Sequence, residues 1–286
     1  MSDILVHTEA GVTTLTIHRP DRKNSITSAM YGAMHEALAA AQADTSVRVV
    51  VFQGSETIFS AGNDIGDFLN TPPAGPDAPV FKFLHTLAAF PKPVVAAVCG
   101  PAVGIGTTML FHCDLVYAGD NAAFSMPFVN LGLCPEAASS LLVPQMLGYH
   151  RAAEALLLGE PFMAEAALEV GLVNRVVPPS EVNALAQAQA RKLAAKPLSS
   201  LLQTSVSSYA VPVKVSRSSW NLNKASFKML TTADPWFEPL VKPLARTRPT
   251  PKVKDVPLSL YSTDESAPKS DQEPPPVVPL RTTSQL

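Results

Sequence analysis

Apolar and polar positions along the chain predict several short strands. Residues 4–17 alternate polar and apolar side chains around Glu9-Ala10-Gly11, a pattern that predicts a β-hairpin. Residues 47–52 and 94–99 are short apolar runs rich in β-branched residues, as expected of strands covered on both faces. Residues 113–117 form a similar run and predict another short strand.

Between these strands, apolar residues recur at helical spacing. Thr27 is a predicted N-cap, and Met30, Met34 and Leu38 follow it on one helical face. The other predicted helices span residues 81–90, 107–112, 137–147, 151–158, 163–170 and 180–195, the last with Ser180 as its N-cap. Strands that alternate with helices predict an α/β fold in which helices cover a sheet.

Two glycine-containing bends follow two of the buried strands. Residues 59–64 read Phe-Ser-Ala-Gly-Asn-Asp, and residues 100–106 read Gly-Pro-Ala-Val-Gly-Ile-Gly. Each bend alone is also explained as a tight connection, because glycine is the usual residue where φ is positive. Bends at the ends of two parallel strands can, however, aim two backbone N–H groups at one oxygen, as an oxyanion hole requires. Neither bend has the G-x-G-x-x-G or P-loop pattern of a nucleotide site.

Composition narrows the class of protein. The chain has 286 residues, 47% of them apolar, and a formal net charge of −2, so it has no electrostatic feature that favours nucleic acid. The three cysteines include no C-x-x-C pair, which argues against disulfides and a zinc site and favours a reducing, cytoplasmic compartment. No metal site, signal peptide or membrane span is expected.

The character of the sequence changes after residue 200. We expect a core over residues 1–200, a divergent helical region over 201–245 and a tail over 246–286 that is rich in proline and predicted to be disordered. The last three residues, Ser284-Gln285-Leu286, are loosely similar to a peroxisomal address.

Four stretches in the first 200 residues carry a family resemblance: FSAGNDI at 59–65, AAVCGPAVGIGTTML at 96–110, CDLVYAGDNAAFSMP at 113–127 and GEPFMAEAALEVGLVNRVVP at 159–178. Together they resemble the crotonase, or enoyl-CoA hydratase/isomerase, superfamily. The resemblance implies a spiral core of repeated ββα units followed by C-terminal helices. It also implies a coenzyme A thioester as substrate, no separate cofactor, and a homo-oligomer, either a trimer or a hexamer.

The resemblance also assigns site residues. It places the two oxyanion amides at Ala61 and Ile105. Hydratases of the family use two glutamates, and Thr108 and Phe128 occupy those positions here, which disfavours hydration. The other positions that the resemblance places at the substrate are Arg22, Lys23, Asn24, Ser60, Gly62, Asn63, Asp64, Ile65, Gly104 and Phe128.

Glu136 is the predicted catalytic base. Residues 126–140, MPFVNLGLCPEAASS, are similar to peroxisomal-type Δ3,Δ2-enoyl-CoA isomerases, in which this glutamate moves the proton. The resemblance thus implies conversion of 3-enoyl-CoA to 2-trans-enoyl-CoA in fatty-acid β-oxidation. Considered without the resemblance, an acidic residue before a helix is a surface group that stabilises the helix dipole, and the dipole and burial shift its pKa in opposite directions.

Alternatives remain open at the level of sequence. The first alternative to an isomerase is a catalytically silent acyl-CoA-binding or assembly protein. The second is an enzyme for another thioester reaction such as hydration or hydrolysis. Asp64 is expected to bond the backbone of its own loop, and His112 is expected to pack at the end of a helix.

Overall fold

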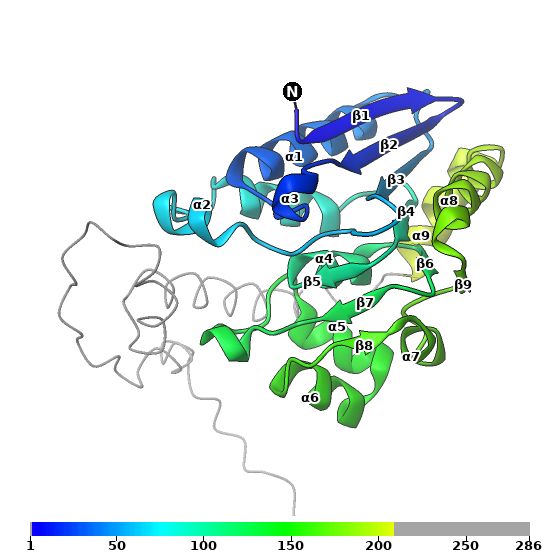
Figure 1. Ribbon diagram of the computed structural model, residues 1–286. Coiled ribbons are helices and arrows are strands. Elements are labelled where there is room, and N and C mark those ends of the chain that lie inside the picture. The colour runs from blue at the N-terminus through cyan, green and yellow to red at the C-terminus, as the bar shows by residue number, and fades with distance from the viewer. Residues whose placement is uncertain (1, 209–286) are drawn as a thin grey trace, which may run out of the picture. The chain divides into compact units, whose positions relative to one another are not determined.

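A six-stranded sheet forms the centre of the computed structural model, which describes residues 2–208. Its order is β1-β2-β3-β4-β6-β9; β1 is antiparallel to β2, and every other pair is parallel (Figure 1). The strands are β1 (Ile4–Glu9), β2 (Val12–Ile17), β3 (Val49–Gln53), β4 (Val94–Val98), β6 (Leu115–Gly119) and β9 (Arg175–Val177). The predicted tail, 246–286, and all but the start of the predicted region 201–245 lie outside the described residues.

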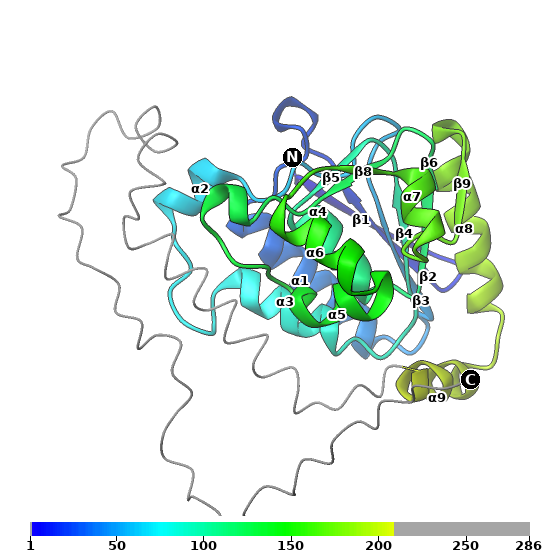
Figure 2. The ribbon, with the colours of Figure 1, turned by 90° about the horizontal axis from the view of Figure 1, so that it is seen from below.

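Helices cover both faces of this sheet, as Figure 2 shows. The helix α8 (Pro179–Ala194) packs on one face, and α1 (Ser28–Ala43) and α3 (Pro79–Ala88) lie on the other. Successive side chains of a strand point to opposite faces, and β4 follows this rule. Its Val95 and Ala97 join the cluster under α8, whereas Val94, Ala96 and Val98 join the larger core on the opposite face.

A second, three-stranded sheet packs beside the first. It contains β5 (Pro101–Val103), β7 (Ala123–Ser125) and β8 (Phe162–Met163) in the order β5-β7-β8. Strands β4 and β5 lead into the helix α4 (Ile105–Thr108), and β1 and β2 lead into α1, so the predicted repeated ββα units are confirmed. Strands β5, β7, β8 and β9 (Arg175–Val177) were not predicted, because runs of two or three residues are too short to show a period.

The described residues also form further helices and 3-10 turns. They are α2 (Ile65–Asn70), α5 (Ser139–Leu147), α6 (Tyr149–Leu157), α7 (Ala164–Glu169), α9 (Leu198–Ser208) and the 3-10 turns η1 (Pro20–Arg22), η2 (Met109–His112) and η3 (Val129–Leu131). Thr27 caps α1 as predicted, because its side chain accepts a hydrogen bond from the Met30 amide. The predicted cap at Ser180 is wrong: α8 starts at Pro179, whose ring presets the helical φ, and no side chain caps it.

Among the helices of residues 2–208, none combines the length and the apolar character needed to cross a membrane.

Candidate active site

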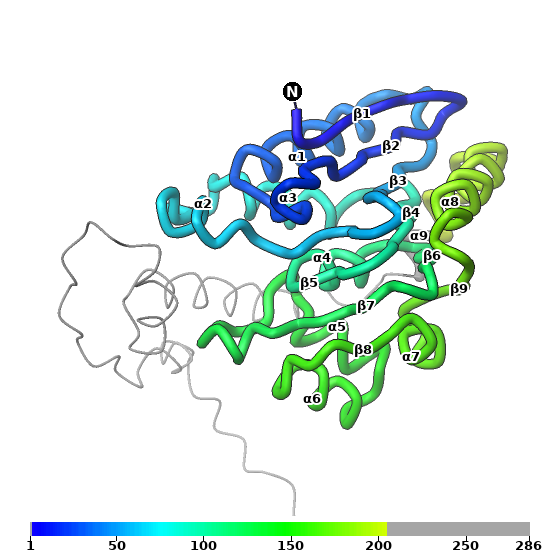
Figure 3. Tube along the Cα trace, in the orientation of Figure 1, coloured from blue at the N-terminus to red at the C-terminus, as the bar shows by residue number. Residues whose placement is uncertain are grey.

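The two glycine-containing bends lie side by side. The Ser60 amide donates to the Pro101 carbonyl at 3.0 Å, and the Val103 amide donates to the Ser60 carbonyl at 2.9 Å. Figure 3 follows both segments, from β3 toward α2 and from β4 through β5 into α4. Gly62 has φ +88°, and a Cβ there would lie 2.9 Å from the Val103 carbonyl oxygen. Glycine is therefore required where the bends meet.

The geometry of these bends points two amides into one cavity. The Gly62 carbonyl accepts a hydrogen bond from the Ile26 amide at 2.8 Å. Because the peptide group is planar and trans, the N–H of Asn63 points away from Ile26. The Gly104 carbonyl accepts from two amides of α4, so the N–H of Ile105 points outward from the start of that helix. Within the described part of the chain, no hydrogen bond uses either amide.

Ala61 does not supply the second donor. Its amide donates to the Lys23 carbonyl at 3.0 Å and is therefore already paired inside the protein. This hydrogen bond contradicts the predicted role of the Ala61 amide, and the unused amide of this bend is that of Asn63, two residues later. Ala61 still lines the cavity through its other atoms.

The cavity opens to solvent, has a volume of about 110 Å³ and is mostly apolar. Predicted residues and unpredicted ones both line it: Ala61, Gly62, Asn63, Ile65, Phe68, Leu69, Val103, Gly104, Ile105, Pro127, Phe128, Leu131, Leu133 and Glu136. An apolar cleft with a few convergent polar groups is the usual form of a site for a small molecule.

Glu136 supplies the carboxylate of this cavity. Its side chain is 4% exposed, and its Oε1 is buried without a hydrogen-bond partner. Burial raises the pKa of Glu136 to about 7. Burial thus outweighs the nearby helix start in setting this pKa, which places it in the range suited to a group that both takes and returns a proton.

Comparison with known proteins agrees with this geometry. The family model described as enoyl-CoA hydratase/isomerase matches residues 7–232. The chain belongs to this family. Enoyl-CoA delta isomerase 2 of Rattus norvegicus is 43% identical to this family member over 183 residues, which cover 62% of this chain and 46% of the rat protein. The 1,2-epoxyphenylacetyl-CoA isomerase of Escherichia coli is 39% identical over 206 residues, which cover 69% of this chain and 78% of that protein.

A solved structure extends the comparison to the fold. The structure of Pseudomonas aeruginosa OdaA superimposes with a TM-score of 0.81 at 43% identity, covering 86% of this chain and 100% of that one. The predicted superfamily and fold are therefore confirmed. The sequence match spans less than half of the length of the rat isomerase, and the two curated relatives carry different activities in their names. Membership of the enoyl-CoA hydratase/isomerase family does not by itself fix a reaction, which depends on the side chains of the site.

The segment that carries Glu136 in this family member has an unusual backbone. Ala137 and Ala138 have φ of 53° and 55°, in the left-handed region that residues other than glycine rarely adopt. His112 contacts the Ala137 carbonyl at 2.8 Å through Nε2, and burial lowers the pKa of His112. We therefore assign the neutral imidazole with its hydrogen on Nε2. This contact and a 2.9 Å bond from the Ser139 amide to the Glu136 carbonyl hold the segment in place.

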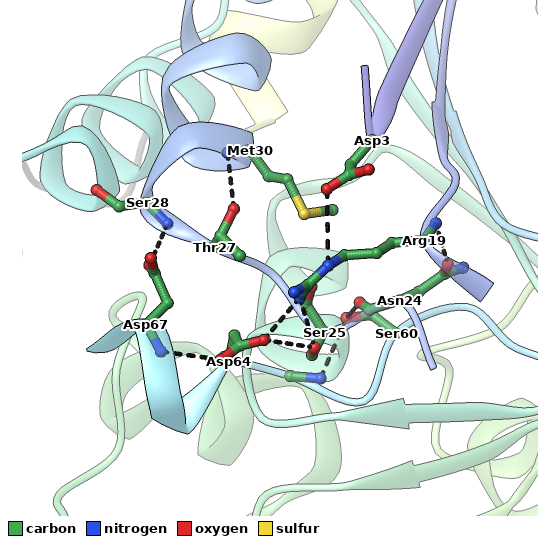
Figure 4. Close-up of polar contacts among 11 residues, drawn as sticks. Asp3, Arg19, Asn24, Ser25, Thr27, Ser28, Met30, Ser60, Asp64 and Asp67 are labelled. Carbon is green, nitrogen blue, oxygen red and sulfur yellow. Dashed lines mark hydrogen bonds and ion pairs between the residues drawn. The ribbon is translucent and has the colours of Figure 1, made fainter. Parts of the chain in front are cut away.

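A polar network anchors the bend that carries Asn63, as Figure 4 shows. Arg19 Nη1 lies 2.6 Å from Asp64 Oδ2, and both side chains are largely buried. Asp64 Oδ1 also accepts from the Asp67 amide at 2.9 Å and so caps α2. Burial would raise the pKa of Asp64, but the Asp67 amide, Arg19 and Ser25 together lower it. Asp64 is thus a fixed anion that bonds its own loop, as predicted.

Two residues that the resemblance placed at the substrate, Asn24 and Ser60, make hydrogen bonds within the fold. The Asn24 side chain is buried, and its Nδ2 donates to the Ile17 and Phe59 carbonyls at 3.1 Å. Ser60 Oγ donates to the Asn24 carbonyl at 2.9 Å. Arg22 and Lys23 are exposed on the loop that precedes α1. The structure therefore brings Glu136, Gly62, Asn63, Ile65, Gly104, Ile105 and Phe128 together, and places Arg22, Lys23, Asn24, Ser60 and Asp64 outside the cavity lining.

The helix α2, which was not predicted, brings Phe68 and Leu69 to the cavity wall. Asp64, placed three residues before Asp67, is a helix N-cap signal that could have located this helix.

The two positions at which hydratases have a glutamate hold other residues here. Thr108 is buried with an unpartnered Oγ1, and Phe128 lines the cavity. In residues 2–208, no His, Cys, Asp and Glu side chains gather in a group that could hold a metal ion.

The raised pKa of Glu136 has a measurable effect on stability. Since its folded pKa of about 7 exceeds the ordinary 4.5, the folded state binds more protons between these pH values. The free energy of unfolding should therefore fall as the pH rises from 4.5 through 7, by about 3 kcal/mol from this group. Urea unfolding of the parent and Glu136→Gln at pH 5 and pH 8 measures this difference, because other groups titrate equally in both. Equal pH dependence in the two proteins would show that Glu136 is not desolvated.

Proposed function

We propose that this protein isomerises 3-enoyl-CoA thioesters to 2-trans-enoyl-CoA thioesters, with Glu136 as its single base and acid. The observation that carries the proposal is the cavity itself, where one buried carboxylate with an unpartnered oxygen accompanies two unused backbone amides. The similarity to the rat enoyl-CoA delta isomerase supports the same reaction.

The reaction needs only these groups. The Glu136 carboxylate takes a proton from C2 of the 3-enoyl thioester, and the electron pair of that C–H bond moves into the dienolate. The amides of Asn63 and Ile105 donate to the thioester oxygen, where the negative charge accumulates. The Glu136 carboxylic acid then returns the proton to C4, and the double bond moves to C2–C3. A pKa of about 7 suits both proton transfers near neutral pH.

The walls of the cavity disfavour hydration. Addition of water needs one group to orient the water and another to handle the proton, and the family's hydratases use two glutamates for this. Here Phe128 fills one of those positions with an apolar ring at the cavity wall, and Thr108 at the other is buried. Glu136 is thus the only carboxylate among the residues that line the cavity in the described part of the chain.

A comparison of two reactions tests the proposal. Purified protein is given trans-3-hexenoyl-CoA and, separately, trans-2-hexenoyl-CoA, and gain or loss of the conjugated thioester is followed by absorbance. We expect isomerisation at least about 100-fold faster than hydration, as general acid–base catalysis by one residue allows. The value of kcat/KM should rise with pH through an apparent pKa near 7, because the free enzyme needs ionised Glu136.

Other outcomes would assign a different function to the same site. Faster hydration than isomerisation would make the protein a hydratase. Thioester binding with neither reaction would favour a silent acyl-CoA-binding protein.

A further inference from the structure

The Asn63 side chain is held by a tyrosine outside the catalytic set. The hydroxyl of Tyr31, on α1, donates a hydrogen bond to Asn63 Oδ1. Tyr31 is 3% exposed, and its ring packs on Phe83 with the ring centroids 5.6 Å apart. Burial, and to a lesser degree the charge of Glu136, raises the pKa of Tyr31 well above 10, so the hydroxyl keeps its hydrogen as a donor at all working pH values.

Two backbone hydrogen bonds to Ile26 flank Asn63. The Ile26 amide donates to the Gly62 carbonyl at 2.8 Å, and the Asp64 amide donates to the Ile26 carbonyl at 2.9 Å. Both hydrogen bonds lie on the Ile26 side of the chain, and they leave the N–H of Asn63 free on the cavity side. A rotation about the chain direction would change the aim of that N–H, and the hydrogen bond from Tyr31 to the Asn63 side chain opposes this rotation.

We propose that Tyr31 is a positioning residue, which through the Asn63 side chain aims the Asn63 backbone amide at the oxygen of the bound thioester. The inference deepens the proposed function and rests on the oxyanion role of the Asn63 amide. Alignment matters because hydrogen bonds weaken steeply as the donor angle closes, and an oxyanion hole works only when its donors are already in place.

A double-mutant cycle tests this path. Tyr31→Phe removes the hydroxyl and keeps the ring on Phe83, whereas Asn63→Ala removes the side chain and keeps the backbone amide. Tyr149→Phe, at a tyrosine on α6 that is 75% exposed, is the matched control. For each variant and for the double variant, kcat and KM are measured with trans-3-hexenoyl-CoA. Circular dichroism establishes that each variant folds.

A second measurement reports on the oxyanion hole without turnover. A thioester of 4-(dimethylamino)cinnamic acid with coenzyme A absorbs at longer wavelength when hydrogen bonds polarise its carbonyl. Its red shift on binding is recorded for the parent and all variants. A parent that shifts the probe but lacks isomerase activity would overturn the proposed reaction and leave the role of Tyr31 testable, so the two failures are distinguishable.

The inference predicts one pattern. Tyr31→Phe and Asn63→Ala should each lower kcat about 10-fold, change KM less than about twofold and reduce the red shift. The effect falls mainly on kcat because a misaligned donor weakens the transition state more than it weakens substrate binding. The double variant should be no worse than either single variant, since both act through one hydrogen bond. An unchanged red shift and kcat in Tyr31→Phe, or effects that multiply in the double variant, would overturn the inference. If Tyr31→Phe does not fold, an unchanged red shift in Asn63→Ala would by itself overturn the inference.

Discussion

Glu136→Gln is expected to lower kcat for isomerisation by about 10⁴-fold, the upper end of what one acid–base group contributes. Glutamine keeps the size and shape of the side chain but cannot take the C2 proton, and Glu136 is the only carboxylate among the cavity-lining residues of segment 2–208. The variant should still bind CoA thioesters, since the amides of Asn63 and Ile105 are untouched. Initial rates with trans-3-hexenoyl-CoA measure the effect.

The matched control is Glu160→Gln, because Glu160 is exposed between α6 and α7 and outside the cavity lining. It should keep the activity of the parent. A Glu136→Gln variant that retains more than about a hundredth of the parent's kcat would contradict the role of Glu136 as the base, because one essential base contributes at least that factor.

Gly62→Ala has the second-largest expected effect. The new Cβ would lie 2.9 Å from the Val103 carbonyl oxygen, at a backbone φ of +88° that alanine rarely adopts. The two bends must therefore separate, and the Asn63 amide loses its aim. We expect kcat to fall by about 100-fold or more, as when one oxyanion donor is removed. Stability should fall by about 1–3 kcal/mol from the strained backbone.

Gly32→Ala is the control for this substitution. Gly32 lies inside α1, and an added Cβ there meets nothing within 4 Å. Alanine should leave activity unchanged and stabilise the protein by about 0.5–1 kcal/mol, because it loses less conformational freedom in a helix than glycine does. Thermal unfolding and initial rates for both variants check the prediction. Equal activity in Gly62→Ala and Gly32→Ala would contradict the close approach of the bends.

The sequence predicted those parts of the fold that have a clear period or a long apolar run. The hairpin and the buried strands β3 and β4 are confirmed, because each shows its pattern over five or more residues. The Thr27 cap is confirmed because threonine before an apolar helical period is a helix-start signal. The strands β5, β7 and β8 are too short for that and depend on tertiary pairing, which one sequence does not display.

The sequence predicted which segments form the site but not which of their atoms face the cavity. The motif around Ala61 located the right bend, yet which amide faces the cavity depends on where the Gly62 carbonyl and the Ala61 amide find their partners, Ile26 and Lys23. Asn24 likewise is polar in a loop and buried in the fold. The sequence does not show whether burial or the nearby helix start dominates the pKa of Glu136, because this pKa depends on what surrounds the carboxylate in the fold.

A deuterium-transfer experiment tests the central claim most directly. trans-3-Hexenoyl-CoA with deuterium in both C2 positions is converted in ordinary water by an excess of enzyme, in a single turnover, and the product is analysed by mass spectrometry and NMR. If the Glu136 carboxyl carries the proton from C2 to C4, deuterium should appear at C4 of the 2-enoyl product, and Glu136→Gln should form almost none of this product. A product whose new C4 hydrogen comes only from water would contradict a shuttle by one carboxyl group.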